Sequence, residues 1–346
     1  MSNLLTYSGI LTKIKAMGSN LITKEEYAHI VALESVSNFI SYLKHHRGFS
    51  RIFQGIDEYT VHRGELERSF IHGLYLDFTK IYQFANMEQR KALGIIFFRY
   101  EVNILKECIL SVYGEKEDYD LSKFESFFAH HSKLNINALS KAESMDEFIG
   151  HLKGSRYANL FVKLASTGKA TPFDYETELD NYYFKTAWRT KSKFLKGTNL
   201  KTYTNTLGAQ IDLFNIMCLY RSKKFFSTNS SEYYGYIVPV NYKLERRQLG
   251  KLLETQSIDD VYSVLRDSYY KDFVPFLKDR NPEQYMDTYI HKLYKKNSNK
   301  YPHSMAPIFY YLNYKEEEIN NITTALECIR YAIDPTESLK YLLLYT

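Results

Sequence analysis

The stretch QIDLFNIMCLYRSKKF, residues 210–225, lies in the middle of the chain and decides its fold. Its apolar residues recur at helical spacing, which predicts a helix with one face against a core. Similar stretches, RYEVNILKECIL and EEEINNITTALE, occur once before it and once after it. The three stretches align at Asn103, Asn215 and Asn321. Self-similarity of this kind predicts a chain that repeats one helical unit.

Two further landmarks accompany each copy, in the same order. A serine opens each copy, at Ser35, Ser144 and Ser257, and an acid followed by an aromatic comes next, at Glu67, Asp180 and Asp287. A serine hydroxyl at a helix N-cap accepts from a free backbone N–H and stabilises the helix by about 1 kcal/mol. Ser144 with Glu147 has the spacing of a reciprocal capping box. The landmarks predict helical repeats over residues 1–115, 116–229 and 230–346.

Composition favours long helices throughout. The chain has 15 Gly and 7 Pro, and no proline precedes Pro172, so few residues interrupt helices in the first half. The run YYGYIVPV at 233–240 alternates weakly, but its Gly235 and Pro239 indicate a linker. We therefore predict an all-α fold, with boundaries near 115, in GEKEDYD, and near 230, in STNSSEYYG.

The charge and apolar patterns are those of an ordinary globular protein. The net charge is +5, with basic and acidic residues interspersed, whereas nucleic-acid binders usually gather basic residues on one stripe. No apolar run approaches the roughly 18 residues that a membrane-spanning helix needs. The N-terminus reads as an amphipathic helix and lacks the features of a signal peptide. These observations predict a cytoplasmic protein.

Signatures of catalysis and of cofactor or metal binding are missing or weak. Cys108, Cys218 and Cys328 each stand in an apolar helical context without a second ligand at metal-binding spacing, so we interpret them as small core residues. The stretch STGKAT at 166–171 lacks the first glycine of a phosphate loop, and Ala170 replaces its magnesium-binding hydroxyl. We predict no catalytic residue, no cofactor and no metal ligand.

The landmarks resemble the C-subunit family of V-type (A-type) ATP synthases and ATPases, which is similar to the d subunit of the eukaryotic V-ATPase. The resemblance covers essentially the whole chain. It begins in LTYSGILTKIKAMGSNLITKEEYAHIVALESVSNFISYL and continues in PFDYETELDNYYF with QIDLFNIMCLYRSKKF. The matching positions there are Glu176, Asp180, Tyr183, Asp212, Asn215, Arg221 and Lys223, and near the C-terminus they are Glu318, Asn321, Ile322 and Pro335.

The resemblance implies a fold and a mechanical role. Members of this family are all-helical, with three similar lobes about a pseudo-threefold axis that form a funnel. The funnel receives the rotor shaft, made of the D and F subunits, and rests on the cytoplasmic loops of the membrane proteolipid ring. Such a protein couples ATP hydrolysis or synthesis to H⁺ or Na⁺ transport without catalysing a reaction. The chain is then expected on the cytoplasmic side of the membrane, and as a monomer outside the complex.

The recurrent polar positions are interpreted as architectural, with partner binding as the alternative. An acid precedes the asparagine by three residues as Asp212 and Glu318, but the first copy has Tyr100 there. A buried asparagine that bonds a neighbouring segment contributes about 1–3 kcal/mol if its loss leaves a partner unsatisfied. The basic group of Arg221, Lys223 and Lys224 is the candidate partner contact. Its alternative role is to stabilise a helix C-terminus.

Two other functions remain open from the sequence. A helical-repeat scaffold or nucleic-acid-binding protein would use the positive charge and the many aromatics, with an affinity that falls steeply as salt rises. An enzyme would need titratable groups with perturbed pKa values in a cleft. The sequence presents neither a basic stripe nor a candidate group of that kind.

Overall fold

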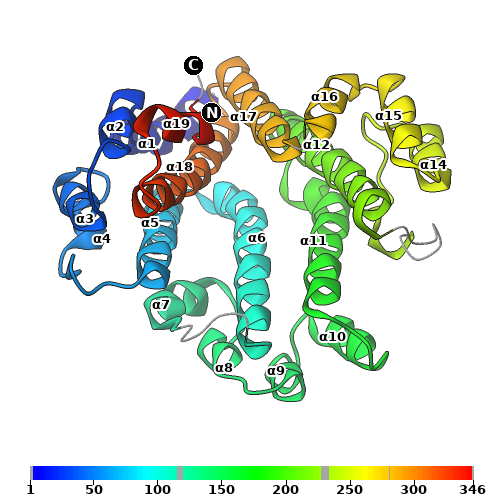
Figure 1. The fold of residues 1–346 in the computed structure, drawn as a ribbon, viewed down its shortest axis with the longest axis horizontal. Helices are drawn as coiled ribbons and strands as arrows, with labels where there is room; N and C mark the ends of the chain where they lie inside the picture. Colours follow the sequence, from blue (N-terminus) through cyan, green and yellow to red (C-terminus); the bar gives the residue numbers. More distant parts are fainter. Residues whose placement is uncertain (1–2, 115–119, 227–233, 280, 345–346) are drawn as a thin grey trace. The chain divides into compact units, whose positions relative to one another are not determined.

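The computed structural model describes residues 3–114, 120–226, 234–279 and 281–344 (Figure 1). Helices account for most of these residues, and no strand occurs among them. The predicted all-α fold is confirmed. The boundaries predicted near 115 and near 230 fall on residues 115–119 and 227–233, which lie outside the described residues, so the division into three repeats stays a prediction.

The chain forms two compact units, and the first joins its two ends, Met1–Asn86 and Met286–Thr346. The helices of this unit are α1 (Asn3–Gly18), α2 (Lys24–Ile30), α3 (Val36–His45), α4 (Ser50–Phe53), α5 (Arg63–Phe84), α18 (Ala306–Arg330) and α19 (Pro335–Tyr341). α18 packs against α1, α3 and α5. Residues from both ends of the chain, such as Phe39, Phe70 and Leu326, therefore share one core.

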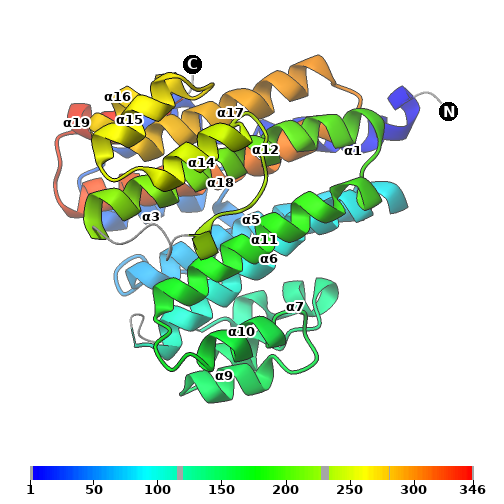
Figure 2. The ribbon, with the colours of Figure 1, turned by 90° about the vertical axis from the view of Figure 1, so that its right-hand side faces the viewer.

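The second unit spans Met87–Tyr285 and is built on three long helices. These are α6 (Met87–Val112), α11 (Pro172–Phe194) and α12 (Gly197–Arg221). α11 packs against both α6 and α12, and Figure 2 shows α6 and α11 running side by side. The shorter helices are α7 (Ser122–His131), α8 (Ile136–Ser140), α9 (Met145–His151), α10 (Ala158–Ala165), α14 (Arg246–Glu254), α15 (Ile258–Arg266) and α16 (Val274–Lys278). α17 (Pro282–Lys300) runs from this unit into the first.

The three predicted serine caps are confirmed. Ser35, Ser144 and Ser257 begin α3, α9 and α15, and each hydroxyl accepts from a first-turn backbone N–H at 3.1–3.2 Å. The capping box predicted at Ser144 is wrong, because Glu147 accepts from the backbone N–H of Glu143 instead. A reciprocal box forms at Ser257 with Asp260. The caps fix where each short helix starts.

The serine-capped helices pack on long helices in a consistent way. α9 contacts α6 and α15 contacts α12, in each case a long helix that precedes it in the chain. α3 has no such long helix before it and contacts α18, near the other end of the chain. Each pairing brings a short capped helix against a long one that carries a recurrent polar residue.

A glycine on α12 provides a test of close packing. A Cβ added at Gly208 would lie 2.7 Å from Cδ2 of the Tyr242 ring, whereas one at Gly250 on α14 meets nothing within 4 Å. We expect Gly208→Ala to lower the free energy of unfolding by about 1–3 kcal/mol through overpacking. Gly250→Ala should raise it by about 0.5–1 kcal/mol, because alanine favours a helix. Urea unfolding measures both, and a neutral Gly208→Ala would contradict this packing.

Candidate functional site

Three of the long helices each carry one buried carboxylate, and we call these three residues the buried acids. They are Glu101 on α6, Asp212 on α12 and Glu318 on α18. Each is at most 2% exposed. A buried carboxylate is costly unless it is paired and hydrogen-bonded, so its surroundings must supply donors.

Glu101 receives its donors from the segments before α8 and after α9. The Tyr157 hydroxyl donates to Oε2 at 2.5 Å, and the Ser132 hydroxyl donates to Oε1. The Arg156 guanidinium lies 3.1 Å from Oε2. The carboxylate on α6 is thus held by one positive charge and two hydroxyl groups from the chain that follows it.

Asp212 is bound in the same manner by the segments around α14 and α15. Its Oδ2 accepts from the backbone N–H groups of Lys243 at 2.7 Å and Leu244 at 2.9 Å, and from the Tyr270 hydroxyl at 2.8 Å. Burial raises the pKa of Asp212 above its ordinary value, although these donors act in the opposite direction. The Tyr270 hydroxyl occupies the place that the Tyr157 hydroxyl has at Glu101.

Glu318 meets the same requirement with different groups. Its Oε1 accepts from the backbone N–H of Ile22 at 2.7 Å, and its Oε2 pairs with the ammonium of Lys315, one turn earlier on α18. The Lys315 ammonium also lies over the Phe49 ring, 4.5 Å from its centroid. Phe49 follows α3 as Tyr157 follows α9 and Tyr270 follows α15. Because Phe49 has no hydroxyl, Lys315 supplies the donor.

The first buried acid is not apparent from the sequence. The alignment at Asn103 places Tyr100 at the acid position, but the structure places Glu101 there, one residue later. The aromatic that follows each capped segment is the available signal. The acidic group that each of these aromatics contacts on a long helix, directly or through Lys315, is the equivalent acid of that copy.

The recurrent asparagines divide into two kinds. Asn215 donates to the carbonyl of Val238 and accepts from its N–H, both at 2.9 Å. Asn321 makes the same pair of bonds to Leu343, at 3.2 and 2.9 Å. Asn103 is exposed and makes no side-chain hydrogen bond to any described residue, because it lies on the outer face of α6. The amide therefore anchors a following extended segment in the second and third copies and has no such role in the first.

The acids before the aromatics lie in three different environments. Glu67 accepts from Arg63 at 2.8 Å on the surface of α5. Asp180 on α11 pairs with Lys106 of α6 at 2.5 Å, and burial raises its pKa while Lys106 lowers it. Asp287 is exposed on α17. The structure does not bring these three acids together.

The basic group lies at the C-terminal end of α12, where cations stabilise the helix dipole. Arg221 pairs with Glu283 at 3.1 Å, and the Lys224 ammonium donates to the Tyr220 hydroxyl. The Lys223 side chain makes no hydrogen bond or ion pair with any described residue. Lys223, which is half-buried, is therefore the member of the group whose charge no described residue pairs.

Other chemistry is not assembled in the described part of the chain. No group of three or more His, Cys, Asp or Glu side chains there is placed to hold a metal ion. Burial raises the pKa of the Cys108 and Cys218 thiols to about 12, so neither is a thiolate at neutral pH. Within the same residues, none of the helices is at once long enough and apolar enough to cross a membrane.

Comparison with known proteins identifies the family of the chain. The family model described as ATP synthase (C/AC39) subunit matches residues 10–341. The chain belongs to this family. Family membership makes it part of an A-type ATP synthase complex, as the resemblance implied.

Archaeal relatives, each named as the C subunit of an A-type ATP synthase, agree with this family over most of the chain. The protein of Methanosphaera stadtmanae is 20% identical over 96% of this chain and 86% of its own. That of Methanobrevibacter smithii is 23% identical over the same shares. The Methanococcoides burtonii protein is 22% identical over 92% of this chain and 89% of its own.

The contrast between Asn215 and Asn103 predicts different effects of one substitution. Asn215→Ala leaves the backbone N–H of buried Val238 without its partner, while the Val238 carbonyl keeps the N–H of Val240 at 2.7 Å. We therefore expect a loss of about 1–3 kcal/mol in the free energy of unfolding. Asn103→Ala should be neutral or gain a few tenths of a kcal/mol, since alanine favours the helix. Urea unfolding compares the two, and equal losses would show that Asn103 is also anchored.

Substitution of two adjacent tyrosines, Tyr269 and Tyr270, tests whether Asp212 depends on a hydroxyl donor. Tyr270→Phe removes a donor to a fully buried carboxylate, and we expect the free energy of unfolding to fall by about 1.5–3 kcal/mol. Tyr269 is 55% exposed, so Tyr269→Phe keeps its ring and should change stability by less than about 0.5 kcal/mol. If both variants unfold at the same urea concentration as the unmodified chain, Asp212 does not depend on the hydroxyl.

Proposed function

We propose that this chain is a non-catalytic central-stalk component of a rotary ATPase. It is a socket that receives the D and F subunits of the rotor shaft and rests on the cytoplasmic loops of the proteolipid ring. In that place it transmits rotation between shaft and ring, and so couples ATP hydrolysis or synthesis to H⁺ or Na⁺ transport. Membership of the ATP synthase (C/AC39) subunit family supports the complex, and the buried acids support the mechanical role.

The observation that carries this proposal is the recurrence of one buried acid per copy. A part that transmits torque must resist deformation, and a buried carboxylate whose donors come from another segment resists their separation. Removing one partner from a buried ion pair, such as that of Lys315 with Glu318, costs about 3–5 kcal/mol. Three such sites lock the short-helix segments onto the long helices, and the third ties the start of the chain to its end through Ile22 and Glu318.

The same repetition suits a socket of three similar lobes. Each copy supplies a long helix with an acid and a capped short helix with an aromatic, and the aromatic meets the acid, or its lysine partner, of another copy. Each copy thus provides an aromatic to one neighbouring copy and an acid to the other. Copies that contact a neighbour on both sides in this way can form a closed ring about an axis. The buried acids themselves are at most 2% exposed, which leaves the shaft and ring to be met by other side chains.

The proposed socket is tested by measuring whether the complex with the shaft forms. We expect the chain, co-expressed with the D and F subunits from the same genome, to co-purify with both through affinity capture and size-exclusion chromatography. A result in which all three chains are folded but elute separately would contradict the socket. It would direct attention to the helical scaffold alternative and to nucleic-acid binding.

Unpaired charge at the end of α12 provides a sharper prediction. We expect Lys223→Glu to reduce recovery of the complex severalfold at low salt, because it reverses the charge that would face an acidic partner. The difference should shrink once the salt exceeds about 0.1 M, where screening acts within about 10 Å. Lys251→Glu, at an exposed lysine near the end of α14, is the matched control. Equal recovery of both variants at every salt concentration would exclude contact at Lys223.

A further inference from the structure

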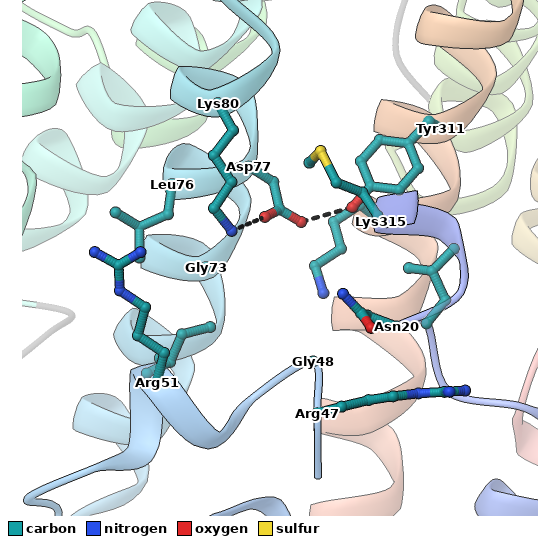
Figure 3. Close-up of a pocket in the computed structure, with 13 residues that line it drawn as sticks. Asn20, Arg47, Gly48, Arg51, Gly73, Leu76, Asp77, Lys80, Tyr311 and Lys315 are labelled. Atoms are coloured by element: carbon teal, nitrogen blue, oxygen red, sulfur yellow. Dashed lines mark hydrogen bonds and ion pairs between the residues drawn. The ribbon is translucent and has the colours of Figure 1, made fainter. Parts of the chain in front are cut away.

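The first unit contains a cavity of about 150 Å³ that the proposed function does not use. It is lined by the end of α1 and the connection after it, by α4 and the connection before it, by the middle of α5 and by the first half of α18 (Figure 3). Sites for drug-sized molecules occupy about 300–1,000 Å³. This cavity therefore suits one compact chemical group.

Two glycines allow close contacts in the walls of the cavity. A Cβ on Gly48 would overlap the carbonyl oxygen of Asn20, and a Cβ on Gly73 would lie 2.5 Å from Cδ1 of Ile52. The connection after α3 and the middle of α5 can approach their neighbours this closely because both residues are glycine. The walls of the cavity are thus set by backbone as well as by side chains.

The lining is strongly basic. Arg47, Arg51, Lys80 and Lys315 contribute to it, against one carboxylate, Asp77. That carboxylate is already occupied, because it accepts from Lys80 at 2.9 Å and from the Tyr311 hydroxyl at 2.7 Å. Lys315 is 3% exposed and pairs with Glu318 outside the lining. The cavity keeps an excess of positive charge after these pairs are formed.

The two arginines carry that excess at the rim. Figure 3 shows Arg47 and Arg51 on opposite sides of the cavity, while the ends of Lys315 and Asn20 lie close together within it. Both arginines are exposed, and neither side chain makes a hydrogen bond or ion pair with any described residue. No bond has to break for either guanidinium to turn over the opening.

We propose that this cavity binds the phosphate group of a small anion, either inorganic phosphate or a phosphate monoester. A guanidinium presents paired N–H donors that match two oxygens of a phosphate, and Lys80 and the Asn20 amide add donors at the wall. The volume admits the phosphate group and excludes a whole nucleotide. The inference is independent of the socket, since assembly with the shaft can succeed or fail without it.

The test titrates inorganic phosphate into the full chain by calorimetry, at constant ionic strength maintained with chloride. We expect saturable binding at one site with a dissociation constant of about a millimolar or below. Arg47→Gln and Arg51→Gln should each weaken binding about tenfold, the effect of losing one charge-assisted hydrogen bond. Arg189→Gln should leave binding unchanged, because this exposed arginine lies on α11, in the other unit.

A second arm separates the two sources of the phosphate group. Flotation with vesicles of phosphatidylcholine and phosphatidic acid, against pure phosphatidylcholine, reports a lipid monoester. Binding of inorganic phosphate without flotation supports a free anion, and flotation that Arg51→Gln abolishes supports a headgroup. The proposal is overturned if neither probe binds, or if Arg189→Gln weakens binding as much as the two cavity variants do. Thermal unfolding of each variant verifies that it is folded.

Discussion

The structure depends on one constraint, which is that a carboxylate buried on a long helix must receive donors from elsewhere in the chain. Glu101, Asp212 and Glu318 lie too deep for water to solvate them, and the helix that carries each one has already used its own backbone donors. The nearest outside donors belong to the segments around short capped helices. Packing of those segments against the long helices therefore supplies hydrogen bonds to the buried carboxylates and also buries apolar side chains.

The three sites satisfy this constraint with different chemistry, and the difference follows from one side chain. Tyr157 and Tyr270 bring a hydroxyl to the acid, whereas Phe49 brings only a ring face. A lysine one turn from Glu318 can pair with the acid and rest on that face at once, so Lys315 replaces the lost hydroxyl. The backbone N–H of Ile22 completes the site and brings in the first residues of the chain.

Features that depend on local spacing can be predicted from the sequence, whereas those that depend on distant partners cannot. Helical content, the serine caps and the polar character of Asn215 and Asn321 follow from periodicity and from cap chemistry. Asn103 aligns with them because its neighbours look alike, yet its side chain faces outward and Glu101 carries the polar role. Neighbouring residues on a helix point about 100° apart. Which of them faces the core is therefore decided by the segment that packs on the helix, and the local sequence does not show it. The basic cavity cannot be predicted from the sequence for the same reason, because its arginines and its lysines come from segments far apart in the chain.

The depth of the buried acids also bears on where function can lie. Each of these acids is at most 2% exposed and faces donors of its own chain, so a partner surface does not reach it and it acts by holding segments in place. In the proposed socket, recognition then falls to charges that the fold leaves unpaired. Lys223 at the end of α12 and the arginines Arg47 and Arg51 at the cavity rim have that property among the described residues. In the proposed socket, buried charge therefore holds the segments together and unpaired charge meets partners and ligands.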